Sequence, residues 1–181
     1  MAASPIDAQR KLTGKESFFD ENEIIVSKSD LTGRITYCND VFVRVSGYSE
    51  SELLGQPHSI LRHPDMPRSV FKLMWDTIQS GAECFAYVLN RTKAGDHYWV
   101  LAHVTPSYDK SGRMVGFHSS RRSPDAAGLE AIRAIYRDVL AAENRYESKR
   151  AQVEAGEQTL RAALDRQGMP YDEFIFSICA A

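Results

Sequence analysis

The sequence predicts an α+β fold in which a five-stranded antiparallel sheet carries short helices on one face and is followed by a C-terminal helical extension. Two observations predict the sheet and its helices. Short runs of β-branched and aromatic residues, separated by tight-turn sequences, lie before and after one central segment. That segment, residues 60–79, repeats its apolar residues at spacings of three and four, which is the helical period. Strands joined by tight turns pair antiparallel, and such a sheet leaves one face for helices.

The composition limits the possible classes of function. A length of 181 residues suits one domain with additional helix, and 43% hydrophobic residues can form a packed core. A net charge of -2 and a pI near 6.2 give no general attraction to nucleic acid or to an acidic membrane. No apolar run approaches the roughly 20 residues that span a bilayer, and no signal peptide is visible. We therefore expect a cytoplasmic protein with no nucleic-acid partner and no membrane insertion within this chain.

The cysteines point to no covalent framework. Cys38, Cys84 and Cys179 are odd in number, far apart, and lack the C-x-x-C or C-x-x-C-H spacing. This argues against a disulfide scaffold, a structural zinc site and covalently attached haem. The simplest expectation is three thiols in a reducing compartment.

The chain divides into three segments by composition. Residues 1–22 form a polar arm, which we expect to be loose, to hold at most one helical turn, and to pack on the domain or on a second copy. Residues 23–122 form the main domain, and residues 123–181 form the helical extension. The domain opens with a hairpin, since strands at 23–28 and 34–38 flank a turn at 30–33.

Two short helices follow the hairpin. Asn39 and Asp40 are suited to cap the first, which Gly47 ends. Ser49 with Glu52 three residues later has the pattern of a capping box for the second.

The central helix begins after a polar loop that has two interpretations. Pro67 suits a first helical turn, Asp65 is placed to cap it, and Gly81 follows as a stop. In one interpretation the loop 62–65 is only the start of the helix, with Arg62 paired to Asp65. In the other it is a ligand-binding loop, because a fixed charge, a titratable ring and a carboxylate lie within four residues.

Three strands complete the sheet, and helices follow. The strands are expected at 84–89, 97–104 and 114–120, with turns at 93–96 and 109–112. After Pro124 a seven-residue apolar pattern is interrupted by charged residues, so a two-helix return with a break near Gly156 is plausible. The apolar segment 171–178 should dock on another surface. The extension covers the open face of the sheet, relays the state of the domain, or dimerises it.

Several runs in the first two thirds of the chain resemble a PAS domain, in particular the flavin-binding PAS domain of aerotaxis receptors. The resemblance covers about residues 24–122. The runs that carry it are NDVF (39–42), VSGY (45–48), LGQPH (54–58), RHPDMP (62–67), MW (74–75) and GDHYWV (95–100).

The resemblance implies a non-covalently bound FAD whose redox state follows cellular electron flow and reshapes the sheet that contacts an output. It implies that the cleft between the central helix and the sheet is open for a tricyclic ring. The matching candidates for cofactor binding are Asn39, Arg62, His63, Asp65, Phe71, Trp75, Asn90 and Trp99.

The chemistry of these residues is compatible with FAD. The amides of Asn39 and Asn90 can donate and accept at the polar edge of the ring, and Arg62 with His63 suits a pyrophosphate. Each residue also has a purely structural interpretation, since Asn39 can be a helix cap and the aromatic residues can be core. The prediction of a cofactor site therefore depends on the occurrence of these residues together and not on any one of them.

The last strand adds His118, two positions after Gly116, where light-sensing flavin PAS domains carry a glutamine that reads the flavin. A histidine there could couple proton uptake to reduction, and it could equally be a strand residue at the sheet edge. No cysteine lies between Gly55 and Gly81, which argues against photoadduct chemistry.

Three functions remain open. The first is a redox or oxygen sensor that binds FAD, forms a homodimer and signals to a downstream protein or domain, as in aerotaxis. The second is a haem b sensor with His58, His63 or another histidine as axial ligand. The third is a cofactor-free dimerisation or scaffold module. An enzyme is not expected, because no nucleophile with a base, paired acids or phosphate-binding glycine loop is present.

Overall fold

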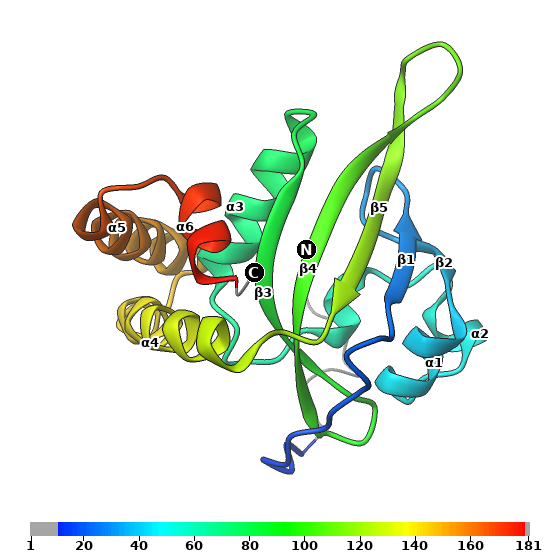
Figure 1. The fold of residues 1–181 in the computed structure, drawn as a ribbon, viewed down its shortest axis with the longest axis horizontal. Helices are drawn as coiled ribbons and strands as arrows, with labels where there is room; N and C mark the ends of the chain where they lie inside the picture. The colour runs from blue at the N-terminus through cyan, green and yellow to red at the C-terminus, as the bar shows by residue number, and fades with distance from the viewer. Residues whose placement is uncertain (1–10, 180–181) are drawn as a thin grey trace.

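The computed structural model describes residues 11–179 and shows the predicted α+β architecture (Figure 1). One antiparallel sheet has the strand order β2-β1-β5-β4-β3. Its strands are β1 (Ile25–Ser29), β2 (Ile35–Cys38), β3 (Cys84–Arg91), β4 (His97–Tyr108) and β5 (Met114–Arg122). The helices are α1 (Asp40–Ser46), α2 (Glu50–Leu53), the 3-10 turn η1 (His58–Leu61), α3 (Arg68–Gln79), α4 (Ala126–Glu143), α5 (Lys149–Gln167) and α6 (Tyr171–Ile178).

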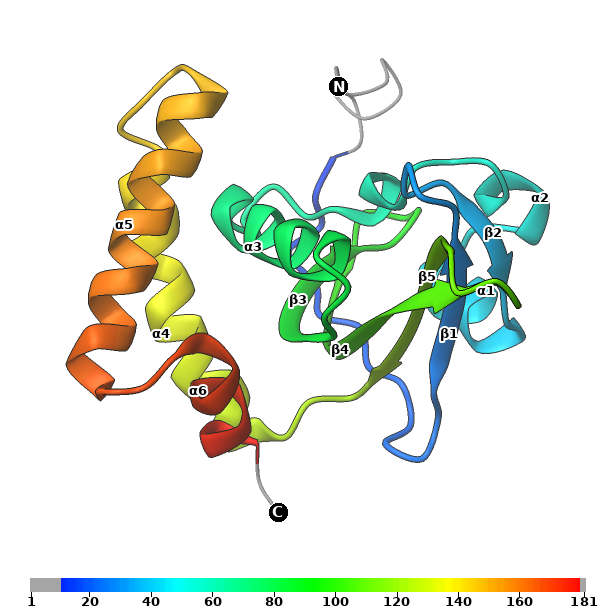
Figure 2. The same cartoon turned by 90° about the horizontal axis from the view of Figure 1, so that it is seen from above.

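The two faces of the sheet have different neighbours. Along each strand successive side chains point to opposite faces, and the register places Ser27, Val100 and Arg121 on the inner face. The inner face meets α1, η1 and α3. The outer face carries Tyr87 and Trp99, and α4 and α6 pack against it. Figure 2 shows the extension beside the β3 edge, with α5 next to α3.

The expected caps of α1 and α2 are confirmed. The Asn39 side chain accepts a hydrogen bond from the Phe42 N–H, and Gly47 ends α1 in the left-handed conformation. At α2, Ser49 and Glu52 form the capping box in both directions. These short helices are held by local hydrogen bonds, so the sequence alone was sufficient to place them.

The predicted cap of α3 is wrong. Pro67 occupies the N-cap position and no side chain of the loop caps the helix. Instead the carboxylate of Glu143, at the end of α4, accepts from the N–H groups of Arg68 and Ser69, both at 2.8 Å, and from the Ser69 hydroxyl at 2.7 Å. Asp65 is far more exposed than Glu143, which is 2% exposed. The buried carboxylate of Glu143, and not that of Asp65, therefore accepts from the free N–H groups at the start of α3.

The space between α3 and the inner face is filled by side chains, so the expectation of an open cleft is wrong there. Ile78 of α3 forms a buried cluster with Cys84, Val104 and Phe117 of the sheet. Trp75 packs on the same cluster, with its ring 5.4 Å from that of Phe117 and nearly perpendicular to it. A tricyclic ring could enter this part of the fold only if these side chains moved.

The extension is a helical hairpin whose turn lies earlier than predicted. The break falls at 144–148, where Ser148 caps α5, and α5 runs through Gly156 without interruption. A Cβ atom at Gly156 would lie 2.5 Å from Glu143 Oε1 and 2.5 Å from Ser69 Oγ. Gly156 is therefore the position at which α5 approaches α3 closely, and it does not end a helix.

The predicted docking of the last helix is confirmed. Phe174 and Ile175 of α6 are 5% and 0% exposed, while Phe176 stacks at a tilt on Phe85 of the outer face. This helix packs against β3, the last strand of the sheet.

The arm runs along the end of β4. His97 donates its N–H to Lys15 O, and Ser17 donates its N–H to His97 O. Residues 11–22 contain no helix, so the helical turn expected there is absent from the described part of the arm. The first ten residues of the predicted arm lie outside the described residues.

Candidate functional site

A cavity of about 280 Å³ lies where the arm, the loop before α3, the β3–β4 end of the sheet and α4 meet. We call it the loop cavity. Three predicted site residues, His63, Asp65 and Trp99, line it. The complete lining is Leu12, Gly14, His63, Asp65, Leu89, His97, Trp99 and Arg133.

The loop holds its own polar residues by local hydrogen bonds. Asp65 donates its N–H to His63 Nδ1 at 3.1 Å, and its carboxylate lies 3.8 Å from the same nitrogen. The His63 ring is buried and makes an edge contact with His97 at 5.7 Å. Burial lowers the pKa of His63, although Asp65 opposes the shift. His63 is therefore a neutral hydrogen-bonding group at the inner wall of the loop cavity.

Trp99 supplies a flat apolar wall. Arg133 of α4 lies over its ring at 5.3 Å, and Tyr136 stacks on it at 6.3 Å. Arg133 also pairs with Glu16 of the arm at 3.0 Å, so the arm and α4 together close the cavity over the tryptophan. The site thus combines an aromatic surface with cationic and hydrogen-bonding groups at its rim.

Arg62, Phe71 and Asn90 meet beside the loop cavity. The Arg62 guanidinium lies over the Phe71 ring at 5.2 Å and donates to Met66 O at 2.9 Å. Its Nε is buried without a hydrogen-bond partner, and the backbone of Arg62 bridges to Asn90 of β3. Burial lowers the pKa of Arg62 to about 10, so the side chain keeps its charge at neutral pH. The predicted pairing of Arg62 with Asp65 is not formed.

Three predicted residues lie elsewhere. Asn39 uses both ends of its amide on the backbone, donating to Ile24 O and accepting from Val26 and Phe42. Trp75 belongs to the cluster between α3 and the sheet. His118 lies on the outer face, paired in register with Lys28. The fold does not bring these three to the loop cavity.

A second polar group, which the sequence reasoning did not single out as a unit, lies on the inner face. We call it the inner polar cluster: Ser27, His58, Tyr98, Ser119 and Arg121. Arg121 donates to Ser119 Oγ at 3.1 Å and to Ser27 Oγ at 2.6 Å. The available signal was alternation along β5, which places Ser119 and Arg121 on one face, but the face itself follows from the pairing.

The residues fit a flavin in chemistry but only partly in space. Buried polar atoms without partners, Arg62 Nε, Tyr98 OH and Arg121 Nη1, mark donors that a polar ligand would satisfy. The loop cavity, at about 280 Å³, is at the lower limit of small-molecule sites, which start at roughly 300 Å³. It can take one ring system of a dinucleotide, and the rest requires side chains of the interior to move.

The buried histidines predict how stability depends on pH. Burial, and then the charge of Arg121, lowers the pKa of His58 well below its ordinary value, and burial also lowers those of His63 and His118. Below about pH 6.5 the unfolded chain therefore binds protons that the folded chain does not. The free energy of unfolding consequently decreases as the pH is lowered below this value. We expect urea unfolding at pH 7.5, 6.5 and 5.5 to show this loss, and His58→Gln to reduce its slope. An unchanged slope in the variant would contradict the assignment.

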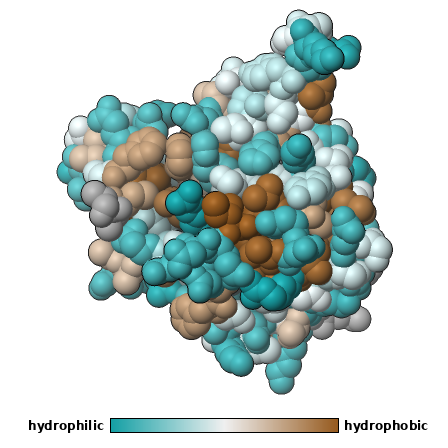
Figure 3. All heavy atoms as spheres, turned by 45° about the vertical axis from the view of Figure 1, so that its right-hand side comes forward, coloured by the Kyte–Doolittle hydropathy of each residue, from teal (hydrophilic) through white to brown (hydrophobic). Residues whose placement is uncertain are grey.

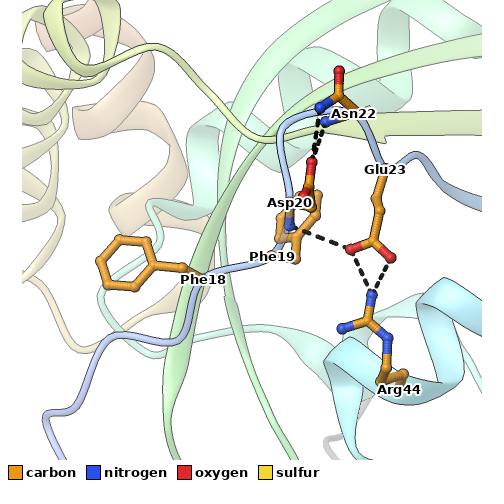
Figure 4. Close-up of a pocket in the computed structure, with 6 residues that line it drawn as sticks. All are labelled: Phe18, Phe19, Asp20, Asn22, Glu23 and Arg44. Carbon is orange, nitrogen blue, oxygen red and sulfur yellow. Dashed lines mark hydrogen bonds and ion pairs between the residues drawn. The ribbon is translucent and has the colours of Figure 1, made fainter.

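A larger hollow of about 580 Å³ at the arm is a weaker candidate (Figure 4). Its charged groups satisfy one another, because Arg44 pairs with Glu23 and the Asn22 side chain donates to Asp20. None of its lining residues has a buried polar atom without a hydrogen-bond partner.

Other classes of site find no support in residues 11–179. No helix of that part of the chain is long and apolar enough to cross a membrane. The same residues hold no group of three histidine, cysteine or acidic side chains placed for a metal ion. Cys38, Cys84 and Cys179 are free thiols.

The sheet and its helices have the PAS fold, and residues 35–121 match the family described as PAS fold. Solved structures agree at the level of the fold. The light-state structure of the blue-light photoreceptor Aureochrome1 LOV is 22% identical, covers 63% of this chain and 90% of its own, and has a TM-score of 0.54.

More particularly, the domain resembles that of the aerotaxis receptor of Escherichia coli (strain K12), which is 41% identical over 117 residues. That match covers 65% of this chain and 23% of the receptor. The nitrogen fixation regulatory protein of Klebsiella pneumoniae is 27% identical over 103 residues, 57% of this chain and 21% of its own. The chain therefore spans less than a quarter of the length of these relatives. The matched family is one of sensor domains, and none of these comparisons indicates an enzyme family.

Proposed function

We propose that this chain is a sensory module that binds FAD without a covalent bond and signals redox state or oxygen. The observation that carries the proposal is the loop cavity, because it unites His63, Asp65 and Trp99, which were assigned to flavin binding from the sequence alone. The similarity to an aerotaxis receptor supports the same function, since that name describes a response to oxygen.

The chemistry of each residue suits it to a different part of the cofactor. The indole of Trp99 offers a stacking surface, and His63 and Asp65 offer a donor and acceptors at the rim. Arg62, with a buried Nε that lacks a partner, is suited to an anionic group next to the loop cavity. The flavin, when bound, would supply the electron transfer, and the protein supplies position, charge and exclusion of water.

The contacts of His58 favour flavin over haem. An axial ligand needs a ring nitrogen free to face iron. His58 Nε2 instead lies 2.9 Å from Ser27 Oγ and 3.2 Å from Arg121 Nη2, and a fixed positive charge at that distance opposes a metal cation. The filled cleft beside α3 is the observation that favours the cofactor-free alternative.

An absorption spectrum separates the three functions. Purified chain is incubated with FAD, freed of unbound ligand by gel filtration, and scanned; a parallel sample receives haemin. We expect the double blue band of a flavin to remain with the protein. A sharp Soret band would establish the haem alternative, and protein that stays colourless in both samples would establish the scaffold alternative.

Replacing His63 tests the loop cavity itself. We expect His63→Ala to weaken FAD binding about tenfold, because a buried hydrogen-bonding group is removed from the wall. The matched control is His103→Ala, which removes a histidine paired with Glu83 on the outer face. Urea unfolding of the ligand-free variants shows whether the fold is retained. Equal FAD affinity in both variants would remove the loop cavity from the binding site.

The extension is suited to relay the state of the loop. Glu143 holds the N-terminus of α3. Burial lowers the pKa of the nearby Arg62, and the negative charge of Glu143 opposes this shift, so the loop before α3 and the helical hairpin interact electrostatically. We propose that residues 1–22 act as an arm, 23–122 as the sensor, and 123–181 as the relay to a downstream protein or domain in the cytoplasm. Apolar side chains gathered on one face (Figure 3), and the exposure of Phe18 (81%) and Phe176 (56%), support a homodimer.

A further inference from the structure

One side of the loop cavity is built by segments that lie outside the matched region of the chain. That region comprises residues 35–121. Leu12 and Gly14 of the arm and Arg133 of α4 nevertheless line the cavity, together with Trp99 of β4. The groups that complete this side of the cavity are therefore a feature of this chain and not of the matched region.

The arm supplies an anion to the cation in the cavity wall. Among the described residues that line the cavity, Arg133 is the one guanidinium. Its Nη2 donates to both carboxylate oxygens of Glu16, at 3.0 and 3.2 Å. The same carboxylate lies 3.9 Å from Nε2 of His97, a second lining residue. Because Arg133 also lies over the Trp99 ring at 5.3 Å, the Glu16 carboxylate is held close to a flat aromatic wall.

The position of the Glu16 carboxylate is the position of an anion beside a stacked ring. Asp65, the carboxylate in the lining itself, has another neighbour, because it lies 3.8 Å from Nδ1 of His63. Arg133 is therefore left to an anion that comes from outside the lining. A ring stacked on Trp99 would bring its own acidic group to the place that Glu16 now fills.

The Glu16 side chain is held less firmly than its backbone. Hydrogen bonds with His97 fix the residues on either side, since His97 N–H donates to Lys15 O at 2.9 Å and Ser17 N–H donates to His97 O at 2.7 Å. The side chains of Arg133 and Glu16 are 44% and 27% exposed, and ion pairs so open to water contribute little because solvent screens them. The carboxylate can turn away at small cost while the arm stays attached.

We propose that Arg133 is the anion-recognition residue of the loop cavity, and that Glu16 occupies it until the phosphate of a ligand displaces the carboxylate. The ligand class is a flat aromatic ring with a phosphate on a short chain. This inference rests on the proposed function, in which the ring is a flavin, and it adds the residue that selects phosphorylated flavins over the uncharged vitamin. A guanidinium suits this role because it binds two oxygens of one phosphate at once.

The test uses the full chain and two probes that differ by one group: FMN carries a phosphate, and riboflavin has the same ring without it. Fluorescence titration gives the Kd of each. We expect wild type to bind FMN about tenfold more tightly than riboflavin. Arg133→Gln should raise the Kd for FMN about tenfold and leave that for riboflavin little changed, and Arg133→Lys should restore part of the loss.

Glu16→Gln tests the displacement, because it keeps the size of the side chain and removes the competing charge. It should lower the Kd for FMN about threefold and leave that for riboflavin little changed. The matched control is Arg137→Gln, one turn further along α4, which removes a charge from an exposed position outside the cavity lining. This control should change neither Kd.

Riboflavin separates recognition of the phosphate from a structural role. If Arg133→Gln loses FMN and riboflavin to the same extent, Arg133 only supports the wall at Trp99 and the inference is overturned. Equal affinity of wild type for the two probes, binding of neither, or weaker FMN binding by Glu16→Gln would also overturn it. In each of these cases, FAD binding by wild type would leave the proposed function standing. A wild-type chain that binds none of the three flavins would overturn both.

Discussion

Replacing Glu143 with alanine is expected to lower the free energy of unfolding by about 3 kcal/mol, because hydrogen bonds to a buried charged group contribute roughly 1.5–3 kcal/mol and two backbone donors lose their cap. The carboxylate accepts from Arg68 N, Ser69 N and Ser69 Oγ, and it is 2% exposed. Urea unfolding measures the loss. Hydrogen exchange should show faster exchange at the amides of Arg68 and Ser69.

The control for this prediction is Glu147→Ala, an exposed glutamate in the turn between α4 and α5. It should change stability by less than about 0.5 kcal/mol. Glu143→Gln, which keeps the size but not the charge, should fall between the two. A loss at Glu143 no larger than at Glu147 would show that α3 does not depend on the extension for its cap.

Gly156→Val is expected to destabilise the protein by about 2 kcal/mol and to separate α5 from α3. A Cβ there would meet Glu143 Oε1 and Ser69 Oγ at 2.5 Å and Ser69 Cβ at 2.8 Å. Overpacking costs about 1–3 kcal/mol, while valine gains only a few tenths of a kcal/mol over glycine in helix propensity, so the steric cost prevails. Urea unfolding measures the net effect.

Gln158→Val provides the comparison, since it places the same side chain at an exposed position of the same helix. It should be nearly neutral. In the double variant Glu143→Ala/Gly156→Val, part of the clash is relieved, so the total loss should be smaller than the sum of the single losses. Strict additivity would mean that Gly156 and Glu143 do not share one contact.

The sequence was most informative where structure is local. The caps at Asn39 and Ser49 and the turns before β2, β4 and β5 depend on residues within a few positions of one another, and all formed as predicted. The helical period of α3 and the apolar character of α6 were equally readable, because burial of one face needs no knowledge of the partner.

The functional site was only partly predictable, because its residues come from different strands and faces. The sequence drew attention to Trp99, yet the register places Tyr98 and not Trp99 beside Asn90 on the inner face. Adjacent strand residues point to opposite sides, so a shift of one position exchanges the two sets. The pairing of Glu16 with Arg133 at the loop cavity became visible only when the arm and α4 were seen to meet there.

By itself the sequence determined the order of strands and helices along the chain, the caps of α1 and α2, and the grouping of charge and rings in the loop before α3. Only the tertiary structure decided that Glu143 caps α3 across 75 positions, that the cleft beside Trp75 is filled, and that Glu16 pairs with Arg133 at the loop cavity. The reason is physical: local propensities act between near neighbours, whereas burial, capping at a distance and the satisfaction of charges depend on which surfaces the folded chain brings together.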